Sequence, residues 1–246
     1  MENQKPFISV VVPLYNEEGN VKELHRRILE ACVKLAKPFE IIFIDDGSTD
    51  NSWGTIEQFA HKNPHVKGIR FMKNFGKSQA LHAGFARANG DVVITMDADG
   101  SHRVEDLPAM MDAQHSSELS ITLGTRWIAG GSVVNWPLTR QLLSRAGTAY
   151  ARIALRIPLH DLTGGFRVYS VALLRKLNLT EMTATGYCFQ IEMAMASELA
   201  GATMHEVPIT FVERINGVSK MSRAIVIEAL WQTTLWGLAR RLRPNA

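Results

Sequence analysis

The chain has 246 residues, 46% of them apolar, and a formal net charge of +3 at pH 7. This length is enough to bury one sizeable hydrophobic core, and so modest a charge gives no reason to expect nucleic acid as a partner. Its two cysteines cannot form a disulfide framework and do not have metal-site spacing. No stretch reaches the roughly 18 apolar residues of a membrane-spanning helix, and the polar start MENQKP is unlike a signal peptide. We therefore expect a protein of the cytoplasm with no transmembrane helix.

The first hundred residues alternate between strand-like and helix-like patterns. β-Branched apolar runs predict buried strands over 7–15, from 39 to the acidic pair at 45–46, over 66–72 and over 91–99. Between them, apolar residues at helical spacing predict helices over 17–36, 52–61 and 77–90. This order of elements predicts an α/β fold, a mostly parallel sheet flanked by helices with right-handed crossovers.

Polar residues stand at the ends of three of these predicted strands. Asn16 and Glu17 follow the first strand, Asp45-Asp46-Gly47-Ser48 end the second, and Asp97-Ala98-Asp99 end the fourth. Because ligands of parallel sheets bind beyond the carboxyl ends of the strands, we expect these residues to form one acidic rim. Asp45 taken alone is explained equally well by a structural role at the start of the next helix.

The pair Asp97 and Asp99 carries more information than a single acidic residue. On a strand these two side chains would point the same way, so both carboxylates would face one spot. Two like charges at one spot require a raised pKa or a cation. Carboxylate oxygens suit Mg²⁺ or Mn²⁺, and such ions usually complete their shell with phosphate oxygens. The pair therefore predicts a metal-bound nucleotide diphosphate at this edge of the sheet.

Two other classes of nucleotide-binding protein are disfavoured. A dehydrogenase of the Rossmann class would have G-x-G-x-x-G after the first strand, where this chain has PLYNEEGN. A P-loop protein would have G-x-x-x-x-G-K-[ST], and NFGKS at 74–78 lacks the earlier glycine. Neither hydride transfer nor P-loop chemistry is expected.

The second half of the chain is basic and holds two amphipathic stretches. Residues 126–175 contain seven arginines and one acidic residue, so an anionic partner is expected there. In the stretch 138–157 one face carries Leu143, Ala146, Tyr150, Ile153 and Ile157, bordered by Arg145, Arg152 and Arg156. Residues 224–243 add Trp231, Trp236 and a basic end. Both stretches are typical of helices at a membrane interface, although core-facing helices with arginine-covered edges have the same pattern.

Several motifs resemble the signature of family 2 inverting glycosyltransferases with the GT-A fold, namely PLYNEEGN, DDGSTDNS, NFGKSQALHAGF and MDADGSH. In the second half, LGTRW, GGSVVNWP, DLTGGFRVY, GYCFQIE and EVPITFVERINGVSKMS are similar to the dolichol- or polyprenol-phosphate mannose synthases of that family. The likeness runs in order from about residue 8 to the C-terminus. NFGKSQAL departs from that branch and resembles the related polyprenol-phosphate glucosyl- or aminosugar transferases.

The resemblance implies a single GT-A domain over residues 1–246, with a nucleotide-sugar-binding half at about 7–115, an acceptor half at about 116–246 and a C-terminal amphipathic helix. It implies that the nucleotide sugar is bound by Pro13, Tyr15, Glu17, Asp45, Asp46, Asp97, Ala98, Asp99, Arg126, Arg214 and Lys220. Asp97, Asp99 and Ser101 would hold Mg²⁺ or Mn²⁺, with Ser101 standing where relatives often carry a glutamine. Catalysis would rest on Asp99, Arg126, Arg214 and Lys220.

From this resemblance we expect transfer of mannose from GDP-mannose to polyprenol or dolichol phosphate with inversion. The protein is expected at the cytoplasmic face of a membrane as a peripheral protein, and an integral-membrane protein is a candidate partner. One alternative is transfer of glucose or an aminosugar from a UDP donor, and another is a non-catalytic nucleotide-sugar-binding subunit of a membrane complex.

No side chain is expected to act as a general base. The acceptor phosphate is itself mostly dianionic at pH 7, because its second pKa is about 6. Many sugar-polymerising relatives place an aspartate base in the segment that corresponds to GYCFQIE, where this chain has Gln190 and Glu192.

Overall fold

The computed structural model describes residues 5–114, 118–182, 184–214 and 223–242. Its strands are β1 (Ile8–Leu14), β2 (Phe39–Asp45), β3 (Val66–Arg70), β4 (Val92–Thr95), β5 (Ser120–Thr125), β6 (Ser132–Val134), β7 (Arg167–Ser170), β8 (Thr203–Pro208) and β9 (Thr210–Val212). Its helices are α1 (Glu18–Lys34), α2 (Ser52–Lys62), α3 (Lys77–Arg87), α4 (Leu107–Ala113), α5 (Leu138–Leu155), α6 (Val171–Lys176), α7 (Gly186–Leu199) and α8 (Arg223–Leu242). Short 3-10 helices are η1 (Val104–Asp106) and η2 (Leu179–Glu181).

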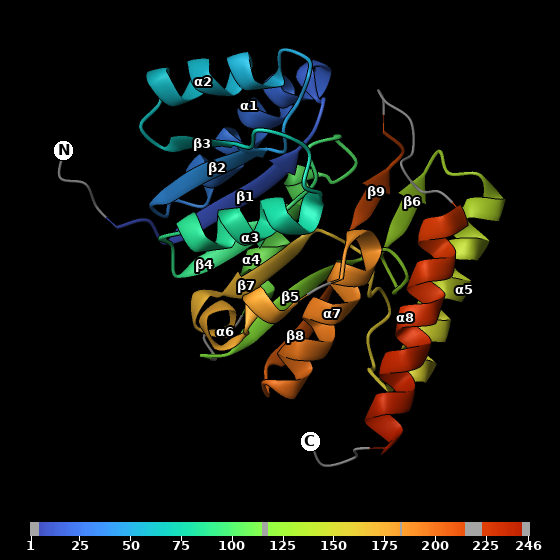
Figure 1. Ribbon diagram of the computed structural model, residues 1–246. Helices are drawn as coiled ribbons and strands as arrows, with labels where there is room; N and C mark the ends of the chain where they lie inside the picture. The colour runs from blue at the N-terminus through green and yellow to red at the C-terminus, as the bar shows by residue number, and fades with distance from the viewer. Residues whose placement is uncertain (1–4, 115–117, 183, 215–222, 243–246) are drawn as a thin grey trace.

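A seven-stranded sheet of order β3-β2-β1-β4-β7-β5-β8 forms the centre of the described structure (Figure 1). Strand β1 pairs in parallel with β2 and β4, β2 with β3, and β5 with β8. Strand β7 runs antiparallel between β4 and β5. The predicted α/β fold with a mostly parallel sheet is confirmed. A separate parallel pair joins β6 and β9.

Apolar residues on both faces of the sheet explain its two helical layers. Every residue of β1 is buried, as expected for a strand covered on both faces. Val10 and Val12 belong to a hydrophobic cluster with residues of α1, α2 and α4. Val11, which points to the opposite face, belongs to a second cluster with residues of α3, α6 and α7. The sheet is therefore the middle layer of three.

The strand register brings three strand ends together at one edge of the sheet. Strand β1 lies between β2 and β4, with Leu14 opposite Asp45 and Val11 opposite Thr95. The backbone N–H of Asp46 donates to the carbonyl of Leu14 at 2.9 Å, so the pairing of β1 with β2 continues into the turn. The residues that follow β1, β2 and β4 therefore meet, as the sequence predicted.

The strand expected over 91–99 is wrong in its length, because β4 ends at Thr95. Asp97 and Asp99 lie in the turn that follows, where Gly100 has a φ of 74°. The Asp99 carboxylate caps this turn by accepting hydrogen bonds from the backbone N–H and the hydroxyl of Ser101, at 3.1 and 2.6 Å. The turn, and not strand alternation, therefore sets the directions of the two carboxylates.

The helix expected over 77–90 is also shorter, because α3 ends at Arg87. Ala88 has an extended backbone with a ψ of 129°, and the N–H of Asn89 donates to the carboxylate of Glu40 at 2.7 Å. Glu40 is buried and also accepts from the hydroxyl of Ser9. This tertiary partner, absent from the local pattern, ends the helix three residues early.

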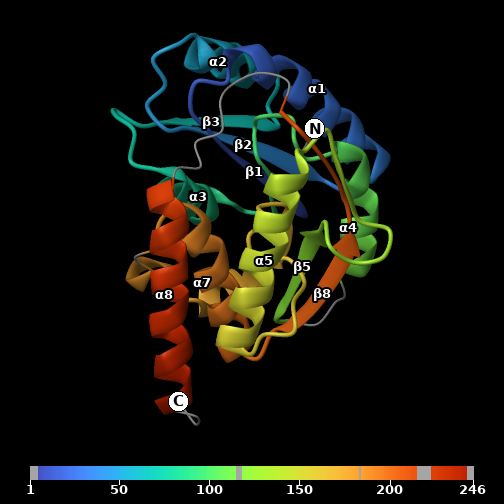
Figure 2. The ribbon, with the colours of Figure 1, turned by 90° about the vertical axis from the view of Figure 1, so that its right-hand side faces the viewer.

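Helices α5 and α8 lie side by side at one flank of the molecule (Figures 1 and 2). They approach closely because α8 has Gly237 at the contact, where a Cβ would lie 2.7 Å from the carbonyl oxygen of Ala154. Helix α5 ends at Leu155, and Arg156 adopts the left-handed conformation. Ile157, expected on the amphipathic face, is instead fully buried in the core. None of the helices in the described ranges is both long and apolar enough to cross a bilayer.

Candidate active site

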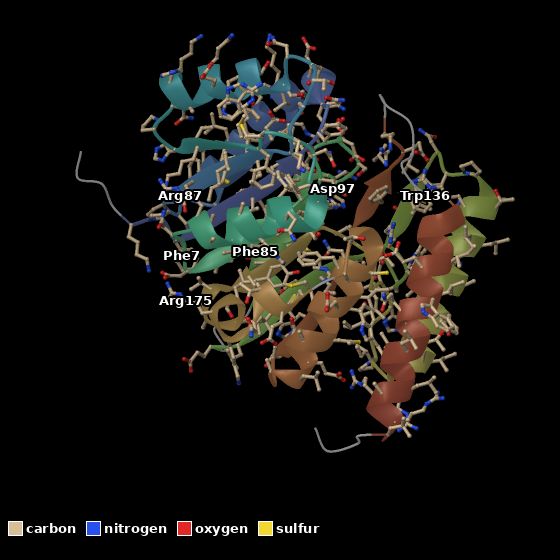
Figure 3. The ribbon with its side chains drawn as sticks, viewed as in Figure 1. Phe7, Phe85, Arg87, Asp97, Trp136 and Arg175 are labelled. Carbon is tan, nitrogen blue, oxygen red and sulfur yellow. The ribbon has the colours of Figure 1, made fainter. Side chains whose placement is uncertain are left out.

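A cavity of about 970 Å³ opens at the carboxyl edge of β1, β2 and β4. Most of the residues predicted to bind the nucleotide sugar line it: Pro13, Tyr15, Glu17, Asp46, Asp97, Ala98, Asp99, Arg126 and Arg214. The same cavity is lined by residues of α5, α7 and α8. Figure 3 shows Asp97 at the end of the sheet and Trp136 beside the start of α5. The fold thus joins the acidic rim to the basic second half of the chain.

Three of the predicted site residues are not among those that line the cavity. Asp45 is fully buried, and its Oδ1 accepts from the N–H of Ser48 at 3.0 Å. Ser101 is also buried, beneath Asp99. Lys220 lies outside the described residues. In the described structure Asp45 and Ser101 therefore support the turns that carry the lining residues.

The Asp97 carboxylate is paired with Lys77, the first residue of α3. Burial opposes ionisation of this carboxyl group, but the positive charge of Lys77, with Arg214 further contributing, lowers the pKa of Asp97 to about 2. Asp97 is therefore an anion throughout the physiological range. Lys77 also lines the cavity. Nothing in the local pattern of NFGKS distinguishes this lysine as a site residue, because its partner Asp97 lies 20 positions away.

The Asp99 carboxylate faces a different cation. Its Oδ2 lies 3.3 Å from Nη2 of Arg214, which follows β9. Next in the chain after Ser101, His102 is buried between the rings of Phe166 and Phe211. Burial lowers the pKa of His102, although both aspartates act in the opposite direction. Its Nδ1 accepts the N–H of Asp97 at 3.0 Å, which requires the unprotonated form of that nitrogen.

Asp46 holds the loop that closes one side of the cavity. Its two carboxylate oxygens accept the backbone N–H groups of Phe75 and Gly76 at 2.7 and 2.9 Å. The neighbouring Gly47 has a φ of 73°, and a Cβ there would collide with the backbone of the same loop. Glycine is required at position 47 for both reasons. The motif DDGS therefore contributes a fixed wall to the site.

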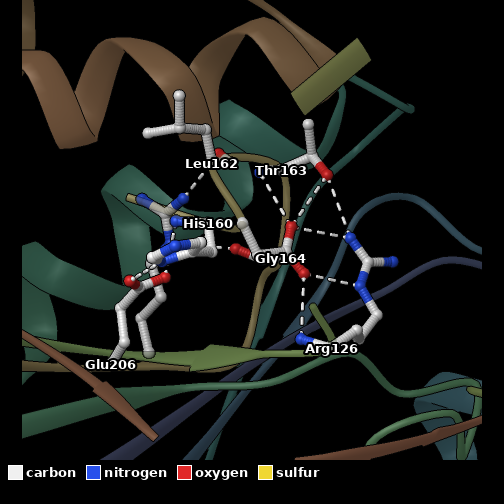
Figure 4. A network of polar contacts seen from close by, with 8 residues as sticks. Arg126, His160, Leu162, Thr163, Gly164 and Glu206 are labelled. Carbon is white, nitrogen blue, oxygen red and sulfur yellow. Dashed lines mark hydrogen bonds and ion pairs between the residues drawn. The ribbon is translucent and has the colours of Figure 1, made fainter. Parts of the chain in front are cut away.

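Arg126 forms a buried ion pair with Asp161, with Nε to Oδ2 at 2.6 Å and Nη2 to Oδ1 at 2.8 Å (Figure 4). Nη2 also donates to the hydroxyl of Thr163 at 3.0 Å. Burial would raise the pKa of Asp161, but the Arg126 guanidinium outweighs that effect and lowers it. This bidentate geometry fixes the plane of the guanidinium at the cavity wall.

Arginines and aromatic rings alternate near the start of α5, and Arg126, Trp136 and Arg140 among them line the cavity. The guanidinium of Arg126 lies 5.4 Å from the ring centroid of Trp136, and that of Arg140 lies 3.9 Å from the same ring. Arg145 stacks over Trp127 in the same way, at 4.8 Å. Arg140 is further paired with Glu213. The excess of arginine in residues 126–175 is the only feature of the sequence that indicates a role for Arg140. Nothing in the local pattern predicts that these arginines stack on tryptophan rings.

The family model described as "Glycosyl transferase family 2" matches residues 9–177, which include all of β1 but its first residue, β2 to β7 and the whole acidic rim. The chain belongs to glycosyl transferase family 2. It is accordingly a glycosyltransferase enzyme, and the expectation drawn from its motifs is confirmed.

Curated relatives of this family 2 glycosyltransferase match over nearly the whole chain. It is 36% identical to "Polyprenol monophosphomannose synthase" of Mycolicibacterium smegmatis, over 95% of this chain and 88% of the relative. It is 37% identical to "Undecaprenyl-phosphate mannosyltransferase" of Micrococcus luteus, over 95% of each chain. It is 36% identical to "Dolichol-phosphate mannosyltransferase" of Pyrococcus furiosus, over 91% of this chain and 61% of the relative.

Solved structures of glucosyl-3-phosphoglycerate synthase from Mycobacterium tuberculosis have the same fold as this family 2 glycosyltransferase. A complex with Mn²⁺, UDP-glucose and phosphoglyceric acid superimposes with a TM-score of 0.68 at 20% identity, over 95% of this chain and 80% of that one. A complex with phosphoglyceric acid gives a TM-score of 0.66 at 20% identity, over 93% and 80%. The predicted GT-A fold is confirmed.

Proposed function

We propose that this glycosyltransferase transfers mannose from GDP-mannose to a polyprenyl phosphate, with inversion at the anomeric carbon. The observation that carries the proposal is one cavity that is lined both by Asp97 and Asp99 and by residues of α5 and α8. A metal-bound nucleotide diphosphate suits the two carboxylates, and a lipid suits the two helices. The names of the relatives from three organisms support mannose as the sugar and a polyprenyl or dolichyl phosphate as the acceptor.

Asp97 and Asp99 fit a divalent cation. Within the described ranges no group of three His, Cys, Asp or Glu side chains forms a closed metal site. Proteins, however, usually bind Mg²⁺ through only one or two carboxylates, and substrate phosphates and water provide the other ligands. The Mn²⁺ in the complexes of the Mycobacterium tuberculosis enzyme supports such an ion here. When bound, it would neutralise charge on the nucleoside diphosphate leaving group.

The residues of the chain contribute to the departure of the diphosphate by charge and by position. Arg214 lies beside Asp99 and Lys77 beside Asp97, so cations from two separate elements face the phosphate end of the cavity. Fixed positive charge aimed at a leaving group lowers the barrier because it requires no reorganisation during the reaction. Pro13 near the end of β1 and Tyr15 just after it also line the cavity and are assigned to the nucleoside.

The acceptor phosphate supplies its own nucleophilic oxygen. Asp161 is held by Arg126 and is fully buried, and the Glu192 carboxylate accepts the N–H of Ala184 at 3.1 Å. Neither carboxylate is needed as a base, because a phosphate monoester is mostly dianionic at pH 7. Arg126 is assigned to aim this dianion at the anomeric carbon, and Arg140, which lines the same cavity, adds positive charge.

Helices α5 and α8 are assigned to the membrane surface. Large apolar side chains that are exposed on them include Leu138, Leu142, Leu143 and Ile153 of α5, and Ile227, Trp231, Leu235, Leu238 and Leu242 of α8. On α8 these five recur at intervals of three and four residues, so they form one stripe. An exposed apolar surface of this size beside arginines is typical of interfacial binding to anionic lipid. We infer peripheral membrane association at this flank.

A UDP-sugar donor is the second candidate. The observation that favours it is Lys77, because the segment NFGKSQAL resembles the glucosyl- and aminosugar-transferring branch and its lysine contacts the candidate metal carboxylate Asp97. Incubation with a panel of radiolabelled nucleotide sugars and a short polyprenyl phosphate, followed by organic extraction, tests both candidates. Label from GDP-mannose in the organic phase is expected. Label from a UDP-sugar alone would favour the second candidate, and no label from any donor would overturn both.

A further inference from the structure

Buried side-chain nitrogen and oxygen atoms that lack a hydrogen-bond partner indicate where a ligand binds in the cavity. Three side chains that line the cavity carry such an atom among the described residues: Nε1 of Trp136, Oγ1 of Thr148 and Oε1 of Gln190. All three side chains are more than nine-tenths buried, with 8%, 4% and 3% of their surface exposed. Buried polar groups in proteins are almost always hydrogen-bonded, because leaving one unpaired is costly. A bound substrate would remove that cost.

The three side chains belong to different ends of the cavity. Trp136 is stacked against Arg126 and Arg140, and Thr148 lies on α5, so both belong to the acceptor side. Gln190 lies on α7. Its backbone carbonyl accepts from Nη1 of Arg167 at 2.8 Å, and Nε of the same arginine donates to the carbonyl of Gly164 at 2.9 Å.

The Arg167 link ties Gln190 to the metal-proximal part of the cavity. Gly165 follows Gly164, and both line the cavity. A Cβ on Gly165 would lie 3.1 Å from Oδ1 of Asp97 and 3.0 Å from Nζ of Lys77. Gln190 is thus joined through one fully buried arginine to a backbone segment that borders Asp97. The donor sugar, attached to the diphosphate, must lie between this region and the acceptor side.

The chemistry of an amide selects one part of the substrates. The Gln190 side chain offers one acceptor and two donors and carries no charge. A sugar hydroxyl both donates and accepts hydrogen bonds, so it matches an amide. A phosphate dianion at pH 7 only accepts hydrogen bonds, and a prenyl chain neither donates nor accepts them. We propose that Gln190 binds a hydroxyl group of the donor hexose and contributes to the choice of sugar. This inference rests on the proposed glycosyl transfer and adds a residue that determines sugar specificity.

A set of deoxy-sugar donors tests the contact through a double-mutant cycle. Dissociation constants are measured by calorimetry, and kcat/KM by transfer, for GDP-mannose and its monodeoxy analogues. If UDP-glucose is the donor that transfers, its deoxy series is used instead. The variants are Gln190→Leu, the unbranched Gln190→Met in case the first does not fold, and the control Gln58→Leu, which changes an exposed glutamine of α2. Binding of the nucleoside diphosphate alone serves as the reference for an intact site.

One deoxy analogue is expected to bind the wild-type protein about tenfold more weakly than the parent sugar. Gln190→Leu or Gln190→Met should weaken the parent by a similar factor and that analogue no further, with nucleoside diphosphate binding unchanged. Gln58→Leu should leave the whole series unchanged. Equal losses on every analogue, or wild-type binding that is insensitive to every deoxygenation, would overturn the role of Gln190 while leaving glycosyl transfer intact. If the wild-type protein neither binds nor transfers any nucleotide sugar, the proposed function fails together with this role.

Discussion

Arg126 and Asp161 are held together by two short contacts, Nε to Oδ2 at 2.6 Å and Nη2 to Oδ1 at 2.8 Å, although they are 35 positions apart in the sequence. Both side chains are buried, with 7% and 0% exposed. Arg126 joins the end of β5 to the turn before β7 through this pair. It therefore presents its guanidinium to the cavity in one orientation, and the carboxylate that fixes it is unavailable for proton transfer.

Removing the charge of Asp161 is expected to destabilise the fold. Asp161→Asn leaves a buried guanidinium without its counter-ion, which typically costs about 3 to 5 kcal/mol. Denaturant unfolding at pH 7 measures the loss. Asp91→Asn is the matched control, because Asp91 pairs with Lys5 at an exposed site and such pairs contribute about 1 kcal/mol or less. A loss no larger than that of the control would contradict the assigned importance of the pair.

The same variant has a defined pH dependence. The pKa of Asp161 is lowered in the folded protein, so the pair contributes stability above the ordinary aspartate pKa of about 3.9. That contribution is lost as the pH falls through the lowered folded value. The difference in unfolding free energy between wild type and Asp161→Asn should therefore shrink on acidification below about pH 4. A difference that stays constant from pH 7 to pH 2 would show that ionisation of Asp161 is not its origin.

The acid limb of kcat/KM is expected to follow the acceptor phosphate. Because its second pKa is about 6, activity should fall on acidification as the dianion is protonated. Glu192→Gln should leave the position of this limb unmoved, even if folding lowers the amount of active protein. An acceptor analogue with a lower phosphate pKa should move the limb to lower pH. A well-folded Glu192→Gln protein that binds both substrates without turnover would refute the base-free reaction.

Metal removal is expected to abolish transfer. EDTA should stop the reaction and Mg²⁺ or Mn²⁺ should restore it, since two carboxylates with phosphate oxygens suit a hard divalent ion. Asp97→Asn should reduce activity by about a hundredfold and should also weaken metal-dependent binding of the nucleoside diphosphate in calorimetry. Asp112→Asn, on the exposed surface of α4, is the control. Full activity of a metal-free preparation would exclude this role for the pair.

The nucleotide preference is expected to favour guanine. Calorimetry with GDP and with UDP, both in the presence of Mn²⁺, compares the two nucleosides without the sugar. We expect tighter binding of GDP, in line with the mannose-transferring relatives at 36–37% identity. The same comparison of GDP and UDP binding is made on Lys77→Gln, because Lys77 contacts Asp97 and belongs to the segment that favours a UDP donor. Tighter binding of UDP by the wild-type protein would overturn the mannose assignment.

Membrane binding is expected to depend on the exposed faces of α5 and α8. Ile153→Ser together with Trp231→Ser removes two large apolar groups that are 72% and 63% exposed. Each such group contributes about 1.5 to 3 kcal/mol when buried, so co-sedimentation with anionic liposomes should fall at least tenfold. The control pair Val33→Ser and Leu199→Ser changes apolar residues of similar exposure on α1 and α7. Equal loss in both pairs would show that this flank has no special role.

The arginines of the same flank supply the electrostatic part. Arg152→Gln with Arg156→Gln should weaken binding to anionic liposomes, and added salt should weaken wild-type binding in the same direction. Both arginines are exposed, whereas Arg145, also expected at this border, stacks on Trp127 and is left unchanged to keep the site intact. Binding that is insensitive both to salt and to these substitutions would favour the reading of α5 as an ordinary core-facing helix.

Local sequence patterns predict the order of strands and helices in the first half of the chain and the polar residues at the ends of the strands. β-Branched runs buried on both faces and apolar residues at helical spacing determine β1 to β4 and the helices between them, because these preferences act over only a few neighbouring residues. The topology of parallel strands then places Tyr15, Asp46 and Asp97 at a common edge. The family motifs are equally local, so the sequence alone was enough to predict a glycosyltransferase.

Only the tertiary structure decided which charges meet. Asp97 pairs with Lys77, Asp99 with Arg214 and Arg126 with Asp161, and each pair joins elements that no local pattern relates. The end of α3 at Arg87 was missed for the same reason, since the partner of Asn89 that ends α3 is Glu40, 49 positions away. Hydrogen bonds and ion pairs of this kind depend on distances set by packing of the whole chain. The composition of the cavity wall, from the β1 rim to α5 and α8, is therefore a property of the fold.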